Sequence, residues 1–84
     1  MKYTYRTRGT CSSRIFFEIE DGKLRNVKFE GGCNGNLQGI GRLVEGMDAE
    51  VAAEKLSGIR CGFKNTSCPD QLANAIRGAL EENA

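Results

Sequence analysis

The pair Asp21-Gly22 is the feature of this sequence that most limits how the chain folds. On either side of it, apolar residues recur at every second position: Ile15, Phe17 and Ile19 in residues 14–20 (RIFFEIE), and Val27 and Phe29 in residues 23–30 (KLRNVKFE). Such alternation is typical of half-buried strands, and Asp-Gly between two strands is the strongest short signal for a β-hairpin. Residues 2–7 (KYTYRT) alternate in the same way. Residues 2–30 are therefore predicted to form a three-stranded antiparallel meander.

The alternation also predicts which side chains face the core. In the second strand, Ile15, Phe17 and Ile19 share one face. In the third strand the same rule places Arg25, Val27 and Phe29 on one face and Leu24 on the opposite face.

After residues 31–36 (GGCNGN) the apolar residues recur at helical spacing. Gly39 and Gly41 each weaken the first predicted helix by about 1 kcal/mol relative to Ala, so this helix needs tertiary support. A second helix follows Asp48, a good N-cap, and stops at Ser57-Gly58. The apolar stripe of the last helix consists of Leu72, Ala75, Ile76, Ala79 and Leu80.

Strands followed by helices predict an α+β fold: a three-stranded antiparallel meander followed by two to three helices packed on one face of the sheet. A chain of 84 residues has room for a single core, so residues 1–84 are expected to form one domain. A core of this size is marginally stable, and chains this short often add a disulfide, a metal or a partner subunit.

The chain has four cysteines, Cys11, Cys33, Cys61 and Cys68, and no histidine. The N-terminus lacks the apolar segment of a signal peptide, and no stretch approaches the ~18 apolar residues of a membrane span. We therefore expect a cytoplasmic protein that contacts no membrane, in a compartment where structural disulfides are disfavoured. Four cysteines in a reducing compartment indicate metal or redox chemistry.

The last cysteine stands at the predicted start of the last helix. Pro69 suits the first position of a helix, which makes Cys68 the expected N-cap, with Ser67 as the alternative. Asp70 falls in the first turn, where the helix dipole favours a negative charge. A sulfur at this place faces free backbone N–H groups and the positive helix end, which favour the thiolate.

Cys33 has a similar setting, between Gly32 and Asn34, where a strand ends and a helix is expected to begin. Cys11 lies in the connection between the first two strands, and Cys61 lies in a loop. All four cysteines thus fall in turns or at element ends. The spacing contains no CxxC pair, so it is neither a zinc-ribbon nor a thioredoxin pattern.

A metal or cluster site is the interpretation that this placement favours. Redox thiols are one alternative, with Cys61 and Cys68 as an exchanging pair in which Cys68 is the attacking thiol. Packing cysteines or an incidental disulfide are another. Without histidine, the ligands must be thiolates, with a carboxylate such as Asp70 as a further option, and thiolate-rich sites select zinc or an iron–sulfur cluster over hard cations. The absence of histidine also excludes a Ser or Cys hydrolase triad of the usual kind, and no catalytic residue is predicted.

The string TSCPD, residues 66–70, is the motif for which the TSCPD domain family is named. With all four cysteines present, the whole chain resembles the short stand-alone members of that family. The resemblance implies a relation to domains near the C-terminus of some ribonucleotide reductases. The chain is too short to be such a reductase, so an accessory module that binds a reductase subunit is the function it implies.

A more distant similarity is to IscU/NifU-type iron–sulfur scaffold proteins. It matches Cys11 before the hairpin, Cys33 in a glycine-rich turn, and Cys68 in the stretch SCPDQLANAI to the three scaffold cysteines. The scaffold's aspartate and histidine are replaced by Ser13 and Ser67. We expect Cys61 to supply the missing ligand, and an iron–sulfur assembly protein is then the implied partner.

Several features concern other partners. Lys2, Arg6, Arg8 and Arg14 make residues 1–17 basic, with Tyr3 and Tyr5 between them. Binding of nucleic acid through stacked tyrosines is one reading. The favoured reading is an edge strand with solvated charges, because the formal net charge is only +1. A homodimer with ligands shared across its interface is compatible with the sequence.

Overall fold

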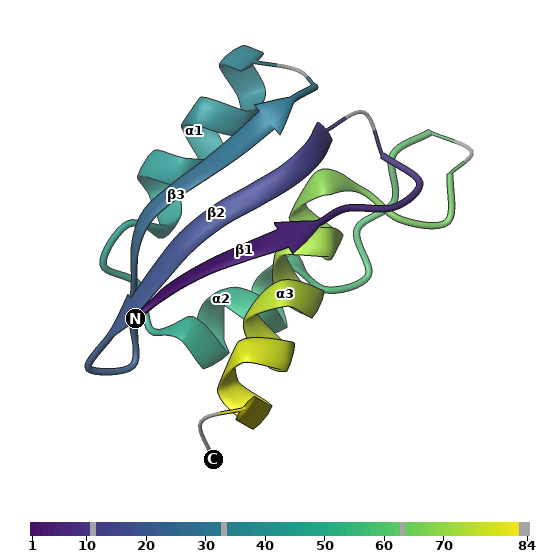
Figure 1. Cartoon of the computed structure of the whole chain (residues 1–84). Coiled ribbons are helices and arrows are strands. Elements are labelled where there is room, and N and C mark those ends of the chain that lie inside the picture. The colour runs from purple at the N-terminus through teal and green to yellow at the C-terminus, as the bar shows by residue number, and fades with distance from the viewer. Residues whose placement is uncertain (11, 33, 63, 83–84) are drawn as a thin grey trace.

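The computed structural model describes residues 1–10, 12–32, 34–62 and 64–82. Three strands precede three helices, as Figure 1 shows. The elements are β1 (Lys2–Arg6), β2 (Ser12–Glu20), β3 (Lys23–Gly31), α1 (Asn34–Val44), α2 (Ala49–Leu56) and α3 (Cys68–Glu82). The predicted α+β class and the predicted order of the elements are confirmed.

The sheet has the order β1-β2-β3, and both neighbouring pairs are antiparallel. Asp21 and Gly22 link β2 to β3 with φ angles of 52° and 77°. Positive φ at both central positions defines the type I′ hairpin, whose twist matches that of the flanking strands. The Asp-Gly prediction is therefore confirmed.

One prediction for β3 is wrong. Leu24 is fully buried in the same core as Val27, instead of lying on the opposite face. The cause is a β-bulge: Phe16 pairs with Lys28 and Glu18 pairs with Arg25, so two steps along β2 match three along β3. The extra residue shifts the alternation, which places Leu24 and Val27 on the same face.

Asn26 is one of the residues within this bulge. Its φ is 53°, a left-handed conformation that asparagine tolerates better than most residues. Its side-chain Nδ2 donates a hydrogen bond of 2.7 Å to the Glu18 carboxylate on β2. On the same strand, Arg25 Nη1 lies 3.8 Å from Oε2 of Glu45, the residue that follows α1.

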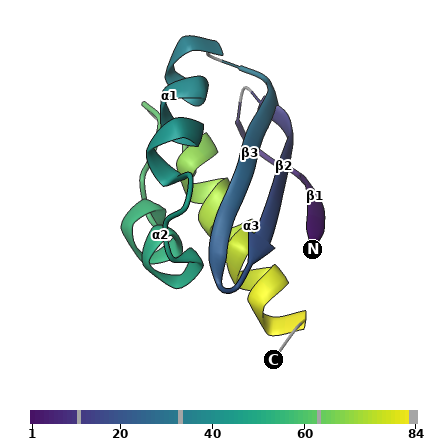
Figure 2. The same cartoon turned by 90° about the vertical axis from the view of Figure 1, so that its left-hand side faces the viewer.

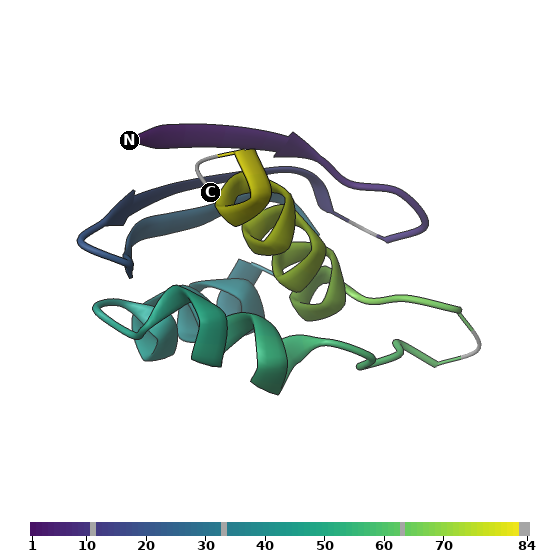
Figure 3. The ribbon, with the colours of Figure 1, turned by 90° about the horizontal axis from the view of Figure 1, so that it is seen from below.

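The helices lie on one side of the sheet, as Figures 2 and 3 show. α1 packs against β3, and α2 packs against α3. The shared core draws Ile15 and Phe17 from β2 and Leu72 and Ile76 from α3, and all four are 2% exposed or less. The prediction of helices on one sheet face is confirmed.

The two glycines expected to weaken α1 differ in their surroundings. A Cβ atom on Gly41 would lie 2.7 Å from the Val27 carbonyl oxygen, so α1 reaches β3 only because this side chain is absent. A Cβ on Gly39 would meet nothing within 4 Å. The approach of α1 to β3 therefore depends on Gly41 and not on Gly39.

The start of α2 follows the sequence closely. Asp48 Oδ1 accepts hydrogen bonds from the N–H groups of Glu50 and Val51, at 3.0 and 3.3 Å. These bonds satisfy two backbone donors that have no partner within the helix, so the prediction of Asp48 as the N-cap is confirmed. Within the described residues, no helix combines the length and the apolar character needed to cross a membrane.

Candidate functional site

The motif of residues 66–70 forms the start of α3, but its cap is Ser67. Ser67 Oγ accepts a hydrogen bond from the Asp70 N–H at 3.1 Å, and the Ser67 carbonyl accepts one from the Gln71 N–H at 2.8 Å. The expectation that Cys68 is the N-cap is therefore wrong, and the alternative, Ser67, is right. A hydroxyl oxygen is a better hydrogen-bond acceptor than a thiol, so the boundary falls one residue earlier.

Cys68 is consequently the first residue of α3, and Pro69 is the second. The N–H of the second helical position also has no intrahelical partner, so proline is tolerated there. Only 6% of Cys68 is exposed. Its Sγ lies 3.1 Å from Ser12 Oγ, within hydrogen-bonding distance. Ser12 is also buried.

Asp70 fastens the loop of residues 57–67 at both ends. Its Oδ1 accepts a hydrogen bond of 2.7 Å from the Gly58 N–H, and its Oδ2 accepts one of 2.5 Å from the Thr66 hydroxyl. The bond from Thr66 is the main cause that lowers the pKa of Asp70 below its ordinary value of 3.8, followed by the bond from Gly58. Both carboxylate oxygens are engaged within the protein, so Asp70 acts here as a clamp on the loop.

Cys61 lies within the loop that Asp70 fastens. Its N–H donates to the Thr66 carbonyl at 3.2 Å, and its own carbonyl accepts from the Lys64 N–H at 3.0 Å. The Cys61 residue is exposed, in contrast to Cys68, and both thiols are free. The loop thus presents one accessible sulfur close to the start of α3.

A groove of about 540 Å³ contains both described cysteines. Gly35 and Asn36, at the start of α1, form part of its wall. The remaining lining is mostly apolar and consists of Leu37, Gly39, Ile40, Leu43, Ile59, Arg60, Ser67 and Pro69. The groove therefore brings together the N-terminal ends of α1 and α3 and the loop that carries Cys61.

Cys11 and Cys33 lie outside the described residues. Ser12, which follows Cys11 in the sequence, contacts Cys68, and the groove includes Gly35, two positions after Cys33. Gly32, with a φ of 78°, belongs to the turn between β3 and α1. Asn34 begins α1, and its side chain is outside what the structure describes.

Among the described residues, no group of three or more His, Cys, Asp or Glu side chains is arranged to hold a metal ion. Two of the four predicted ligands are not within that part of the chain. The four-cysteine site therefore remains a prediction.

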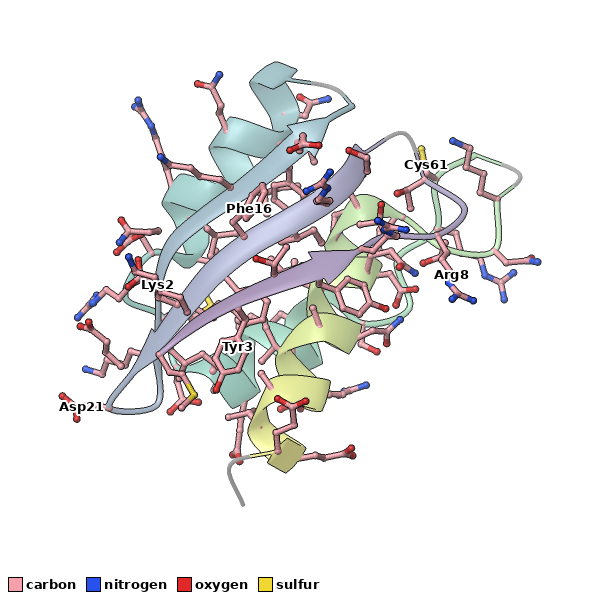
Figure 4. The ribbon with its side chains drawn as sticks, viewed as in Figure 1. Lys2, Tyr3, Arg8, Phe16, Asp21 and Cys61 are labelled. Atoms are coloured by element: carbon pink, nitrogen blue, oxygen red, sulfur yellow. The ribbon has the colours of Figure 1, made fainter. Side chains whose placement is uncertain are left out.

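The end of the molecule that carries Cys61 is basic. Arg6, Arg8, Arg60 and Lys64 are exposed, and Figure 4 shows Arg8 and Cys61 at the same end, away from Lys2 and Asp21. The two salt bridges between described residues join Arg14 to Glu30 and Arg25 to Glu45. Of these cations, Arg60 lines the groove itself.

The tyrosines of β1 contribute to the core. Tyr3 and Tyr5 are half-buried and pack against the core, and the Tyr3 ring lies 5.2 Å from that of Phe17 in a stacked arrangement. β1 is an edge strand with exposed Lys2 and Arg6. β1 is thus a charged edge strand whose aromatic side chains pack on the core.

Sequence reasoning missed three polar residues that build this region: Ser12, Thr66 and Gln71. Gln71 Nε2 donates to Thr66 Oγ1 at 3.0 Å, and Gln71 Oε1 accepts from the Arg8 N–H at 3.1 Å. A signal for Gln71 was present, because it stands beside Leu72 on the apolar side of α3 and is 7% exposed. A polar residue in such a place needs hydrogen-bond partners.

The family model of the TSCPD domain matches residues 1–80 of this chain. The chain therefore belongs to the TSCPD domain family. No curated protein and no solved structure matches it. The more distant similarity to IscU/NifU-type scaffolds gains no support from these comparisons.

Proposed function

We propose that this TSCPD domain is a small metal-binding protein that holds zinc or an iron–sulfur cluster through Cys11, Cys33, Cys61 and Cys68. The observation that supports it is the groove, which contains two free cysteines and the N-terminal ends of two helices. The sequence neighbours of the other two cysteines are at the same place: Ser12 contacts Cys68, and Gly35 lines the groove.

The chemistry of the surroundings suits thiolate ligands. Helix N-termini place partial positive charge near Cys68 and at the start of α1. Ser12 Oγ lies near enough to Cys68 Sγ to donate a hydrogen bond to a metal-bound sulfur, a contact that orients such ligands and tunes the metal. The exposed cations beside Cys61 offset the negative charge that four thiolates bring to one site.

The first experiment is metal and sulfide analysis, with a visible spectrum, of protein purified anaerobically without added metal. Brown protein with iron and sulfide would identify a cluster protein, and one colourless zinc per chain would identify a zinc site. Protein that binds no metal, even after reconstitution with zinc or with iron and sulfide, would contradict the proposal.

Single Cys→Ser variants at the four positions test the ligand set. Each is expected to lower the metal content, because serine is a poor ligand for zinc and iron at neutral pH. Ser13→Ala is the matched control, since Ser13 is exposed and lies two residues after Cys11. Unchanged metal content and thermal stability in Cys68→Ser would exclude the site as proposed.

A thiol redox function of Cys61 and Cys68 is the second candidate. Its support is that both thiols are free and line the same groove. Their difference in burial supports the opposite order of roles from the sequence expectation, with the exposed Cys61 as the sulfur that meets a substrate and the buried Cys68 as the resolving thiol. Thiol-reactivity profiling separates the functions, because a closed metal site protects all its sulfurs whereas a redox pair has one hyper-reactive thiol.

The partner that we propose is a ribonucleotide reductase subunit or an iron–sulfur assembly protein. This proposal rests on the two family resemblances alone. A pull-down with the tagged full chain, analysed against a control in which Arg8, Arg60 and Lys64 are replaced by Ser, is the test. Capture of either partner by the wild-type chain would support it, and capture of neither would contradict it.

A further inference from the structure

Gln71 joins the connection between β1 and β2 to the loop of residues 57–67, which contains Cys61. Its Oε1 accepts a hydrogen bond from the Arg8 N–H, in the connection between β1 and β2 that also contains Cys11. Its Nε2 donates to the Thr66 hydroxyl, in the loop that contains Cys61. One side chain thus contacts both loops from the first turn of α3.

The network continues from Thr66 in two directions. The Thr66 hydroxyl donates to the Asp70 carboxylate, and the Thr66 carbonyl accepts from the Cys61 N–H at 3.2 Å. Gln71 is therefore separated from the Cys61 backbone by a single residue. On α3, Gln71 and Cys68 are three positions apart, which places them on neighbouring parts of the same helical face.

Because Gln71 is buried, the folded protein would be destabilised if its side chain made no hydrogen bonds. Only 7% of the residue is exposed, and among the described residues no buried side-chain nitrogen or oxygen lacks a partner. A buried amide without partners would lose its hydrogen bonds to water and gain none in the protein. The glutamine is held in a single arrangement by two hydrogen bonds of ordinary length, 3.1 and 3.0 Å.

We propose that Gln71 is a positioning residue of the metal site. It holds the connection between β1 and β2 and the loop that contains Cys61 against the first turn of α3, which begins with Cys68, while it binds no metal itself. The inference rests on the proposed four-cysteine site, and it extends that site to a neutral, buried group that the ligand pattern does not include.

The test compares zinc affinity in wild-type protein, Gln71→Met and Gln71→Glu, by competition with a chromophoric chelator. Gln71→Met keeps the length of the side chain and removes both hydrogen bonds. We expect its zinc affinity to fall by about 10- to 100-fold, the usual loss when a group that orients ligands is removed. Gln71→Glu keeps the acceptor for Arg8 and loses the donor to Thr66, so its affinity should lie in between.

Asn74→Met is the matched control, because Asn74 is an exposed amide on the same helix. Its zinc affinity should equal that of the wild type. The visible spectrum of the Co²⁺-loaded proteins gives a second readout, since altered ligand geometry shifts the bands of Co²⁺ and a loss of fold stability alone does not. Urea unfolding of each metal-free protein identifies variants that do not fold, and in that case Gln71→Glu replaces Gln71→Met as the deciding variant.

The outcomes separate the two proposals. If the wild type binds neither zinc nor a cluster, the proposed function fails and this inference fails with it. If the wild type binds zinc, and Gln71→Met is folded and has the same affinity and the same Co²⁺ spectrum, only the inference is overturned. Weaker binding with an altered spectrum, absent from Asn74→Met, would establish the positioning role.

Discussion

At the scale of single residues, every member of the TSCPD motif has a local task in the structure. Thr66 and Asp70 fasten the loop, Ser67 caps α3, Cys68 is buried against Ser12, and Pro69 lines the groove. The motif therefore caps α3 and holds the preceding loop by hydrogen bonds, in addition to carrying a cysteine.

The clamp formed by Asp70 predicts a pH-dependent stability. Because folding lowers the pKa of this carboxyl below 3.8, its contribution is complete above that pH and is lost as the pH falls through the lowered value. We expect wild-type protein to be more stable than Asp70→Asn near neutral pH, with a difference that shrinks in acid. Urea unfolding of both metal-free proteins between about pH 7 and about pH 3 measures it.

Asp21→Asn is the control for this series. Asp21 is exposed in the type I′ turn, where asparagine is as well suited as aspartate. The variant should unfold like the wild type near neutral pH. A difference between wild type and Asp70→Asn that is independent of pH would show that the carboxylate charge is not what the clamp uses.

At the scale of elements, the glycines of α1 show how packing overrides helix propensity. Gly39 and Gly41 have the same intrinsic cost in a helix, but only Gly41 lies against the Val27 carbonyl. Two glycines in one helix therefore differ: close packing requires Gly41, whereas no packing contact requires Gly39.

A pair of alanine variants tests this difference. Gly39→Ala should raise the free energy of unfolding by up to about 1 kcal/mol, because its Cβ enters open space and alanine favours the helix. Gly41→Ala should lower it by about 1–2 kcal/mol, since the contact with β3 outweighs the gain in propensity. Chemical unfolding monitored by circular dichroism gives both values, and equal effects of the two substitutions would refute the packing argument.

At the scale of the whole molecule, the four cysteines come from four segments spread over residues 11–68. A metal that joins these segments would link the connection after β1, the turn after β3, the loop and α3. In a chain of 84 residues with a small core, such a link is a large share of the total stability.

Metal binding is therefore expected to raise the temperature of unfolding. A ligand that binds only the folded protein adds about 2.7 kcal/mol when its free concentration is one hundred times its Kd. Thermal unfolding at several buffered zinc concentrations measures the effect, and a chelator should reverse it. Mg²⁺ is the control, because it prefers oxygen ligands. A Tm that changes with neither zinc nor iron and sulfide would contradict a structural metal.

Local patterns in the sequence were sufficient to predict the strands, the hairpin and the helices. Asp21-Gly22 and Asp48 act within a few residues of themselves, so their effects could be inferred without knowledge of the fold. The bulge at Asn26 could not be predicted, because it depends on the pairing of β3 with β2. Its consequence, the burial of Leu24, is a tertiary effect.

The features of the candidate site likewise fall into those that the sequence determined and those that only the tertiary structure revealed. The sequence by itself determined the four cysteines, the motif around Cys68 and the membership of the TSCPD family. Only the tertiary structure showed that Ser12 contacts Cys68, that Cys61 shares a groove with Cys68, and that Gln71 joins two loops. These contacts join residues up to 63 positions apart, and such distances are closed by packing of the sheet and helices, which no local pattern encodes.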